Sequence, residues 1–398
     1  MEAQIHRQQW RMPTVAVPEP ASTAKACYLD GWRPGVDEYP FDSKEMMSAA
    51  TSFRRQKGIP FKHQFFSKTL EDDRYQGQIS TKNLGELAID PSKGILNRKI
   101  AFIHVDGNNF GRIRRDCCGT EESRRNFDHS IQNDFRKDSF LKALLEMATK
   151  DANFQTQGSD KKPALRLEVL LWGGDEMTLV VPAWQGWRVM RLFYDKARTL
   201  HFESVPLSQR AAVIFCHHNA PILLIRQLAE DLLGVTKGDI LTRLEESPRY
   251  TELNADARKQ MKAQLSDHTL GDALHYLVLE SFDLLRGDIK QFLGEYYKGG
   301  NYANLLIYAN ELDAVLKAIH TIQLSVSRGK ALKIIEALQG KKTGDIKKIS
   351  DEICRLLPRE ERRRVQDAIA ALTLKQECLE RWYLATDLWD YVAEGAIS

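Results

Sequence analysis

The sequence predicts an α+β fold, and three observations carry that prediction. Residues 100–105 form a short, almost wholly apolar run, which is typical of a central strand covered on both faces. Residues 165–171 alternate between apolar and polar, and a glycine-rich turn separates them from the apolar run 177–181, which predicts a β-hairpin. Residues 211–216 are again continuously apolar and predict a fourth buried strand.

Helical segments separate these strands. Apolar residues recur at helical spacing over 127–148, 184–200 and 222–232, which predicts helices there. The resulting order β-α-β-β-α-β-α is that of a ferredoxin-like split βαβ unit with an extra helix. We therefore expect four antiparallel strands with helices on one face, and the end of the first strand beside the hairpin.

The chain divides into three predicted regions. Residues 1–97 carry many prolines and glycines and are interpreted as an N-terminal extension of uncertain fold, with one helix over 43–58. Residues 98–287 hold the α+β domain. Residues 288–398 have helical periodicity and predict a C-terminal helical bundle.

Within the last two regions we expect further elements. The highly charged stretch 237–272 predicts an insertion or helical excursion, and 275–282 predicts one more strand. The helices of the bundle are expected at 312–319, 332–338 and 349–357, with a break at 340–344.

Composition limits the possible classes of protein. With 43% hydrophobic and 28% charged residues, a chain of 398 residues can build real cores. The formal net charge of +3 is close to neutral, so any site for a polyanion must be local. The sequence contains no apolar run of about 18 residues, which argues against a membrane span.

Cysteine usage favours a reduced, cytoplasmic protein. No two of the six cysteines form a CxxC pair, so a structural zinc site or a disulfide framework is not expected. The cysteines stand at positions 27, 117, 118, 216, 354 and 378.

Three acidic residues are the candidate catalytic and metal-binding groups. Asp106 follows the first strand, and Asp175 and Glu176 lie in the bend of the hairpin. If the first strand and the hairpin are neighbours, these carboxylates converge. Such an all-oxygen site suits Mg²⁺ or Mn²⁺, and a pair of ions there serves in-line phosphoryl transfer. Either motif alone is often only a turn or a cap, so the prediction depends on their combination.

Glycines and backbone N–H groups around the acids predict nucleotide binding. Gly107 allows a sharp turn and close approach of a triphosphate, and Gly173 and Gly174 leave room for a nucleotide. The N–H groups of the next four residues are expected to cradle phosphate oxygens. These residues are Asn108, Asn109, Phe110 and Gly111.

These motifs resemble a known family. DGNNFG at 106–111, GGDE at 173–176 and FCHHNAP at 215–221 are similar to the cyclase palm of the CRISPR polymerases. Those proteins are the large subunits of type III CRISPR effector complexes and are relatives of the GGDEF diguanylate cyclases. The similarity runs from about 98 to about 282, and the helical tail resembles the domain that follows the palm.

The resemblance implies roles for specific residues. Asp106 corresponds to the first metal ligand, with the carbonyl of Gly107 as an additional ligand, and Asp175 and Glu176 correspond to the acidic pair of the hairpin. It implies a GGDEF-like palm that makes a cyclic oligonucleotide messenger from ATP in antiviral defence. It also implies CRISPR subunits or RNA as partners. Because a single palm holds one nucleotide against its metals, joining two nucleotides requires a second palm, so we expect either a homodimer through the palm or a second palm-bearing partner.

The chain also departs from the family. The acidic pair is Asp175-Glu176 where the CRISPR polymerases usually carry two aspartates, and Met177 stands where the cyclases have Phe. A His-Asp nuclease motif, a second palm and the zinc-binding cysteines are missing from the sequence. We therefore expect a compact or stand-alone relative.

Two further residues are candidates for nucleotide contact. His218, beside His217, would reach a phosphate, although Asn219 and Pro221 equally predict a helix start with a satisfied imidazole, and we favour that interpretation. Lys237 would neutralise a triphosphate, although a surface lysine is usually only solvated.

Other functions stay open at the sequence level. A palm that is inactive would instead act as a scaffold or RNA-binding subunit of an RNA-guided complex. A template-dependent polymerase would need a basic, fingers-like surface, which the sequence does not show clearly.

Overall fold

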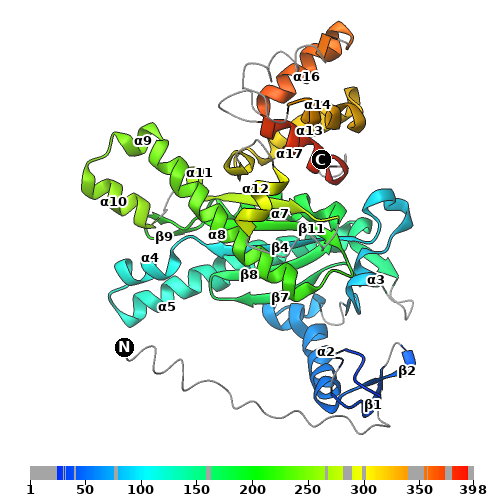
Figure 1. The fold of residues 1–398 in the computed structure, drawn as a ribbon. Coiled ribbons are helices and arrows are strands. Elements are labelled where there is room, and N and C mark those ends of the chain that lie inside the picture. The colour runs from blue at the N-terminus through cyan, green and yellow to red at the C-terminus, as the bar shows by residue number, and fades with distance from the viewer. Residues whose placement is uncertain are drawn as a thin grey trace. The chain divides into compact units, whose positions relative to one another are not determined.

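The computed structural model forms two compact units, Met1–Gln78 and Ile79–Ser398. Figure 1 shows the helices and strands of both units. The structure describes residues 25–29, 31, 33–39, 42–75, 79–157, 163–264, 268–280, 289–297, 302–338, 354–355, 357–372 and 379–392.

The first unit contains a small antiparallel hairpin followed by one long helix. Strands β1 (Asp37–Tyr39) and β2 (Asp42–Met47) pair with each other, and α2 spans Ala49–Leu70. The helix predicted over 43–58 is therefore wrong at both ends. Its first residues form β2, and Ser48 caps the helix by accepting a hydrogen bond from the backbone N–H of Thr51.

A six-stranded mixed sheet forms the centre of the second unit, in the order β13-β12-β11-β4-β8-β7. All neighbouring pairs are antiparallel except β11 and β12, which are parallel. The strands are β4 (Lys99–Gly107), β7 (Glu168–Gly173), β8 (Glu176–Pro182), β11 (Gln209–His217), β12 (Ala273–Val278) and β13 (Ile307–Tyr308). The predicted strands 100–105, 177–181 and 211–216 are confirmed as parts of β4, β8 and β11. The strand predicted over 165–171 instead begins at Glu168, because Leu165 belongs to a separate short strand, β6 (Pro163–Leu165). The return strand predicted over 275–282 is confirmed over 275–278, and residues 281–282 lie outside the described residues. The four predicted strands pair antiparallel with one another, as expected, and β12, whose direction the sequence left open, adds parallel to β11.

Helices cover both faces of this sheet, so the expected cover on one face alone is wrong. Gly186 at the start of α7 (Gly186–Ala197) packs so closely on Ala101 that a Cβ atom at residue 186 would lie 2.7 Å from the Ala101 Cβ. His104 points to the opposite face, since side chains alternate along a strand. There, burial lowers the pKa of His104; Glu176 and Glu230 oppose this effect, and Arg226 adds to it. Glu230 and Arg226 belong to α8 (Ile222–Glu246). Cover on both sides explains why residues 100–105 are almost fully buried.

The remaining helices of the α+β part lie in three connections, as the apolar spacing predicted. The connection from β4 to β7 contains α4 (Phe110–Cys117), α5 (Glu121–His129), the π-helix η3 (Ser130–Leu141) and α6 (Lys142–Lys150). Helix α7 joins β8 to β11. The connection from β11 to β12 contains α8, α9 (Pro248–Thr251), α10 (Ala255–Gln264) and α11 (His268–Gly271).

Within the second unit, a smaller sheet joins the segment 79–97 to residues 155–157 and 163–165. Strand β3 (Ile79–Ser80) pairs with β6 (Pro163–Leu165), which also pairs with β5 (Gln155–Gln157). Arg166 is 5% exposed, and its guanidinium donates to the backbone oxygen of Leu87 at 2.6 Å.

The C-terminal part is helical, as predicted. Its helices are α12 (Ile289–Tyr296), α13 (Leu312–Ser325), α14 (Arg328–Leu338), α16 (Arg359–Ala371) and α17 (Leu379–Asp387). The break at 340–344 lies outside the described residues, as does most of the helix predicted over 349–357. In the described parts of the chain, no helix is long and apolar enough to cross a membrane.

The contact between α7 and β4 gives a direct test of the packing. Gly186→Ala should lower the free energy of unfolding by about 1–3 kcal/mol, because the new methyl group would overlap the buried side chains of Ala101 and Phe215. Urea unfolding measures the change. Gly234→Ala in α8 is the matched control. Its new Cβ meets no atom within 4 Å, so it should be neutral or stabilise the helix. Equal effects at the two positions would contradict the packing described.

Candidate functional site

The end of β4 and the β7–β8 hairpin bring three carboxylates together. Asp106 and Glu176 are directly opposite each other in the antiparallel β4–β8 pair. The backbone N–H of Gly107 donates to the backbone oxygen of Asp175 at 3.2 Å. Two segments far apart in the sequence are thus fixed side by side by main-chain pairing, and Asp106, Asp175 and Glu176 share one end of the sheet.

The hairpin bend is tight and open to solvent. Gly173 pairs with Glu176, so Gly174 and Asp175 alone form the turn. Gly174 has φ of 56°, a conformation that favours glycine at the first central position of such turns. A Cβ atom at Gly173 or Gly174 would meet no atom within 4 Å. The space above the bend is therefore free of neighbouring side chains among the described residues.

The end of β4 and the turn after it are closely packed, and Phe110 and Asn108 have structural roles there. Gly107 must be glycine, since a Cβ atom there would lie 2.5 Å from the ring of Phe110. That ring is 2% exposed and is not available to a ligand. Asn108 is fully buried, and its side chain donates to Ser208 Oγ and Gly271 O. Its backbone N–H donates to Ser208 O, so it does not contribute to a phosphate cradle in this conformation.

Helix α4 begins with an unusual cap. Asn109 has φ of 56°, and within the described structure its side chain makes no capping hydrogen bond to the helix. Its Oδ1 instead accepts from Lys237 Nζ of α8 at 2.7 Å. Gly111 in the first turn is exposed. The structure thus brings Lys237 to this turn, beside the N-terminus of a helix, where backbone N–H groups favour anions.

Arg210 is a site residue that the sequence analysis missed. It lies opposite Asp106 in the β11–β4 pair, and its guanidinium forms an ion pair with the Asp106 carboxylate. The same guanidinium donates to Asn108 Oδ1 at 2.9 Å and to the backbone oxygen of Gly107 at 3.4 Å. An arginine directly before the apolar run 211–216 was the available signal, but only the strand register reveals its partner.

Arg136 is a second missed residue. It belongs to η3, is 3% exposed and donates from Nη1 to the backbone oxygen of Glu176 at 2.7 Å. Burial lowers its pKa to about 10, against the opposing effect of the carboxylates, that of Asp175 first. The sequence does not mark this residue, because most of its neighbours at helical spacing, Gln132, Asn133 and Ser139, are polar.

The acidic cluster is therefore neutralised from within. Burial raises the pKa of Asp106 to about 6; Arg210 opposes this rise, while Asp175 and Glu176 add to it. Lys237 also favours the ionised form of Asp106. Three carboxylates thus face three cationic side chains, which come from η3, β11 and α8.

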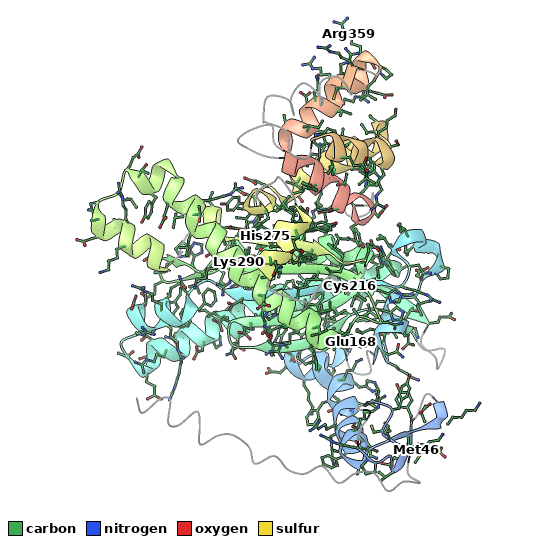
Figure 2. All side chains as sticks on the ribbon, viewed as in Figure 1. Met46, Glu168, Cys216, His275, Lys290 and Arg359 are labelled. Carbon is green, nitrogen blue, oxygen red and sulfur yellow. The ribbon has the colours of Figure 1, made fainter. Side chains whose placement is uncertain are left out.

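His218 does not belong to this cluster. Strand β11 runs antiparallel to β4, so Gln209 lies opposite Gly107 while His217 lies opposite Lys99. Seven residues separate Lys99 from Asp106, which corresponds to roughly 23 Å along a strand. Cys216, which Figure 2 labels, marks this far end of β11. His218 comes two residues later in the chain, and its backbone N–H donates to Arg98 O at 2.9 Å. The predicted contact of His218 with the same nucleotide is wrong for this reason.

The donor atoms are of the chemical type that a hard divalent cation prefers. Asp106, Asp175, Glu176 and the Gly107 carbonyl all offer oxygen atoms. Among the described residues, no three His, Cys, Asp or Glu side chains are placed as a ready metal site. At Asp106 the carboxylate and the adjacent carbonyl are in contact with the Arg210 guanidinium, which is the cation at that position.

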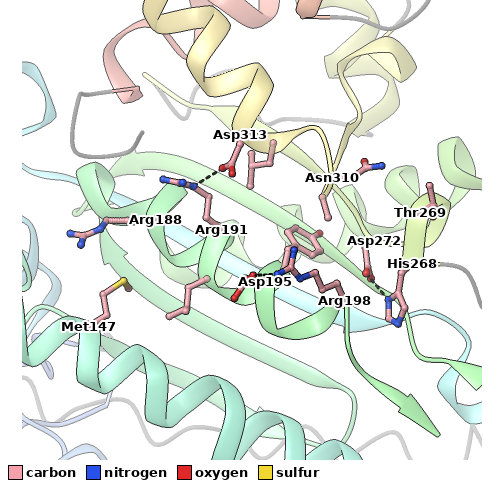
Figure 3. Close-up of a pocket in the computed structure, with 14 residues that line it drawn as sticks. Met147, Arg188, Arg191, Asp195, Arg198, His268, Thr269, Asp272, Asn310 and Asp313 are labelled. Atoms are coloured by element: carbon pink, nitrogen blue, oxygen red, sulfur yellow. Dashed lines mark hydrogen bonds and ion pairs between the residues drawn. The ribbon is translucent and has the colours of Figure 1, made fainter. Parts of the chain in front are cut away.

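A cavity of about 590 Å³ lies elsewhere, between α7, α11 and the start of α13 (Figure 3). None of the acidic cluster lines it. Most of its charged side chains pair with one another, and Arg188 pairs with Asp151 outside the lining. The pairs are Arg191 with Asp313, Arg198 with Asp195, and His268 with Asp272.

Comparison of the chain with protein-family models gives no match, and comparison with curated proteins gives none either.

The raised pKa of Asp106 predicts a specific pH dependence of stability. Because the folded-state pKa lies above the ordinary value of 3.8, the contribution of this carboxyl group to stability is greatest below pH 3.8. That contribution is lost as the pH rises through about 6. The free energy of unfolding of Asp106→Asn, taken relative to that of the wild type, should therefore increase by up to about 3 kcal/mol as the pH rises from 4 to 7. Urea unfolding of both proteins across this range tests it, and parallel pH profiles would refute the assignment.

Proposed function

We propose that the protein is a metal-dependent nucleotidyl transferase or cyclase that makes a cyclic oligonucleotide messenger from ATP. The observation that carries the proposal is the register that sets Asp106 opposite Glu176, with Asp175 bonded through its backbone to Gly107. Isolated carboxylates repel one another and a triphosphate, so a cluster of three at an open bend is favourable when cations are bound there.

The strand order supports a palm-type domain. Strands β4, β7, β8 and β11 are the first to fourth strands of the predicted β-α-β-β-α-β unit, and they lie in the order β11-β4-β8-β7. That is the arrangement expected of a ferredoxin-like split βαβ unit, with β12 and β13 added at one edge. The resemblance to the CRISPR polymerase palm and to the GGDEF cyclases belongs to the same proposal. So does a role in antiviral defence in the cytoplasm.

Asp106, Asp175, Glu176 and the Gly107 carbonyl would hold Mg²⁺ or Mn²⁺. When bound, two such ions supply activation of the attacking hydroxyl and charge neutralisation on the leaving group. Residues of this chain would bind and orient the nucleotide. Gly173 and Gly174 leave room for the nucleotide above the bend, and the first turn of α4 together with Lys237 offers positive charge to its phosphates.

The reaction is an in-line displacement at the α-phosphorus of ATP. A 2′- or 3′-hydroxyl oxygen of a second nucleotide forms the new P–O bond and loses its proton. The bond to the β-phosphate breaks, and pyrophosphate leaves. One site of this kind holds one nucleotide, so we propose that a second site comes from a homodimer through the palm or from another palm-bearing protein.

A second candidate function is a scaffold or RNA-binding subunit of an RNA-guided complex with an inactive palm. The ion pair between Arg210 and Asp106 favours it, because a carboxylate held by a guanidinium is less available to a metal. Product formation separates the two candidates.

Activity assays test the proposal. The purified chain is incubated with ATP or GTP and with Mg²⁺ or Mn²⁺, and products are separated by chromatography and identified by mass. Asp175→Asn and Glu176→Gln should each lower product formation at least about 100-fold, since each removes a group that acts on developing charge. Glu121→Gln, which neutralises an exposed carboxylate of α5, is the matched control and should keep full activity.

Two results would contradict the proposed function. One is unchanged activity in the Asp175 and Glu176 variants. The other is no product from either nucleotide, with either metal, by a folded wild-type protein; combined with tight binding of RNA, it would favour the scaffold function.

A further inference from the structure

Arg210 occupies the place that a metal ion would take. Its guanidinium contacts the Asp106 carboxylate and the Gly107 carbonyl, two of the oxygen donors named above, and also Asn108 Oδ1. These contacts bridge three consecutive residues of the turn after β4. A cation and a guanidinium cannot both hold this carboxylate and carbonyl in the same way, so metal binding requires Arg210 to change partners.

The pair lies in a setting where losing a partner is costly. The Arg210 side chain is 12% exposed and that of Asp106 is 17% exposed. Removing one member of a largely buried ion pair leaves an uncompensated charge, which is strongly unfavourable. If a metal takes Asp106, Arg210 therefore needs another anion close by.

Arg210 also has capacity for another ligand. Its Nε is buried and has no hydrogen-bond partner among the described residues. An unsatisfied buried donor is itself unfavourable, so the present arrangement is not the best one available to this side chain. A phosphate group accepts hydrogen bonds from two guanidinium nitrogens at once, which a single carboxylate contact does not fully replace.

The other two cations of the cluster are held differently. Arg136 donates to a backbone oxygen, and Lys237 donates to the amide oxygen of Asn109. Within the described structure, Arg210 is the one of the three that forms an ion pair with a cluster carboxylate. It is therefore the residue whose position depends directly on what Asp106 binds.

We propose that Arg210 is an exchangeable counter-ion, which holds Asp106 in the nucleotide-free protein and moves to the triphosphate when metal and nucleotide bind. The inference rests on the proposed function and adds a property to it. The metal alone competes with Arg210 and binds weakly. Nucleotide draws Arg210 away, and the metal then binds tightly.

This exchange makes the binding of metal and of nucleoside triphosphate cooperative. Linkage requires that each ligand raise the affinity for the other by the same factor, and couplings of this type are typically about 5- to 150-fold. The practical result is a site that stays closed to free divalent cations and is assembled only around its substrate.

Manganese titration measures the coupling without any turnover. Mn²⁺ binding to the full chain is followed by electron paramagnetic resonance, with and without an ATP analogue whose α,β-bridging oxygen is replaced by a methylene group. In the wild type, the affinity of the protein for Mn²⁺ should be at least about fivefold higher with the analogue than without it. Mn²⁺ bound by the free analogue is measured separately and subtracted. In Arg210→Gln, Mn²⁺ alone should bind about tenfold tighter, and the coupling should fall towards one.

Arg226→Gln is the matched control. It removes one positive charge from an exposed residue of α8 that pairs with Glu230, outside the acidic cluster. Its Mn²⁺ affinity and coupling should equal those of the wild type, which separates a change at Arg210 from a change in net charge. Arg210→Lys keeps the charge but lacks the planar fork, so it should fall between the wild type and Arg210→Gln. Circular dichroism confirms the folding of each variant, and the Lys variant decides the question if the Gln variant does not fold.

The outcomes distinguish the inference from the function beneath it. Suppose that the wild type binds Mn²⁺ in the presence of the analogue. If Arg210→Gln then shows the same coupling and an unchanged or weaker affinity for Mn²⁺, the counter-ion role is refuted, and the metal site itself is not. If the folded wild type binds no Mn²⁺ in either condition, the metal-dependent function fails and the inference fails with it.

Discussion

The register between β4 and β8 is the constraint on which the site depends. It sets Asp106 opposite Glu176, and the hydrogen bond from the Gly107 N–H to the Asp175 oxygen extends the pairing to the bend of the hairpin. A shift of one residue would turn Asp106 to the other face of the sheet, because side chains alternate along a strand. Burial of β4 between α7 and α8 prevents such a shift, since it would exchange the residues that pack against the two helix layers.

The same burial creates the electrostatic problem of the site. Carboxylates at the end of a doubly covered strand lose hydration, which is why the pKa of Asp106 rises. Three cationic side chains from separate elements, those of Arg136, Arg210 and Lys237, compensate the negative charge. This neutralisation keeps a folded, metal-free site possible. It also means that a divalent cation has to compete with side chains already in place.

Much of this arrangement could be predicted from the sequence, because local patterns report burial. The apolar run 100–105 and the hairpin around Gly174 are confirmed as β4 and β7–β8, and the motifs that follow them carry the acids. What the sequence could not supply was register. Arg210 and Arg136 act through partners distant in the chain, and the register of β11 with β4 leaves His218 at the opposite end of the sheet from the acids. The strand at β12 was predicted but its direction was not, since a strand's apolar pattern does not encode its direction.

The central claim is that Asp106, Asp175 and Glu176 share divalent cations beside a triphosphate. Anomalous diffraction from crystals grown with Mn²⁺ and a non-reactive ATP analogue locates the metal directly. The account predicts manganese peaks within bonding distance of Asp106 and of at least one of Asp175 and Glu176. Manganese bound only elsewhere, with Arg210 still on Asp106 and the analogue in place, would contradict it.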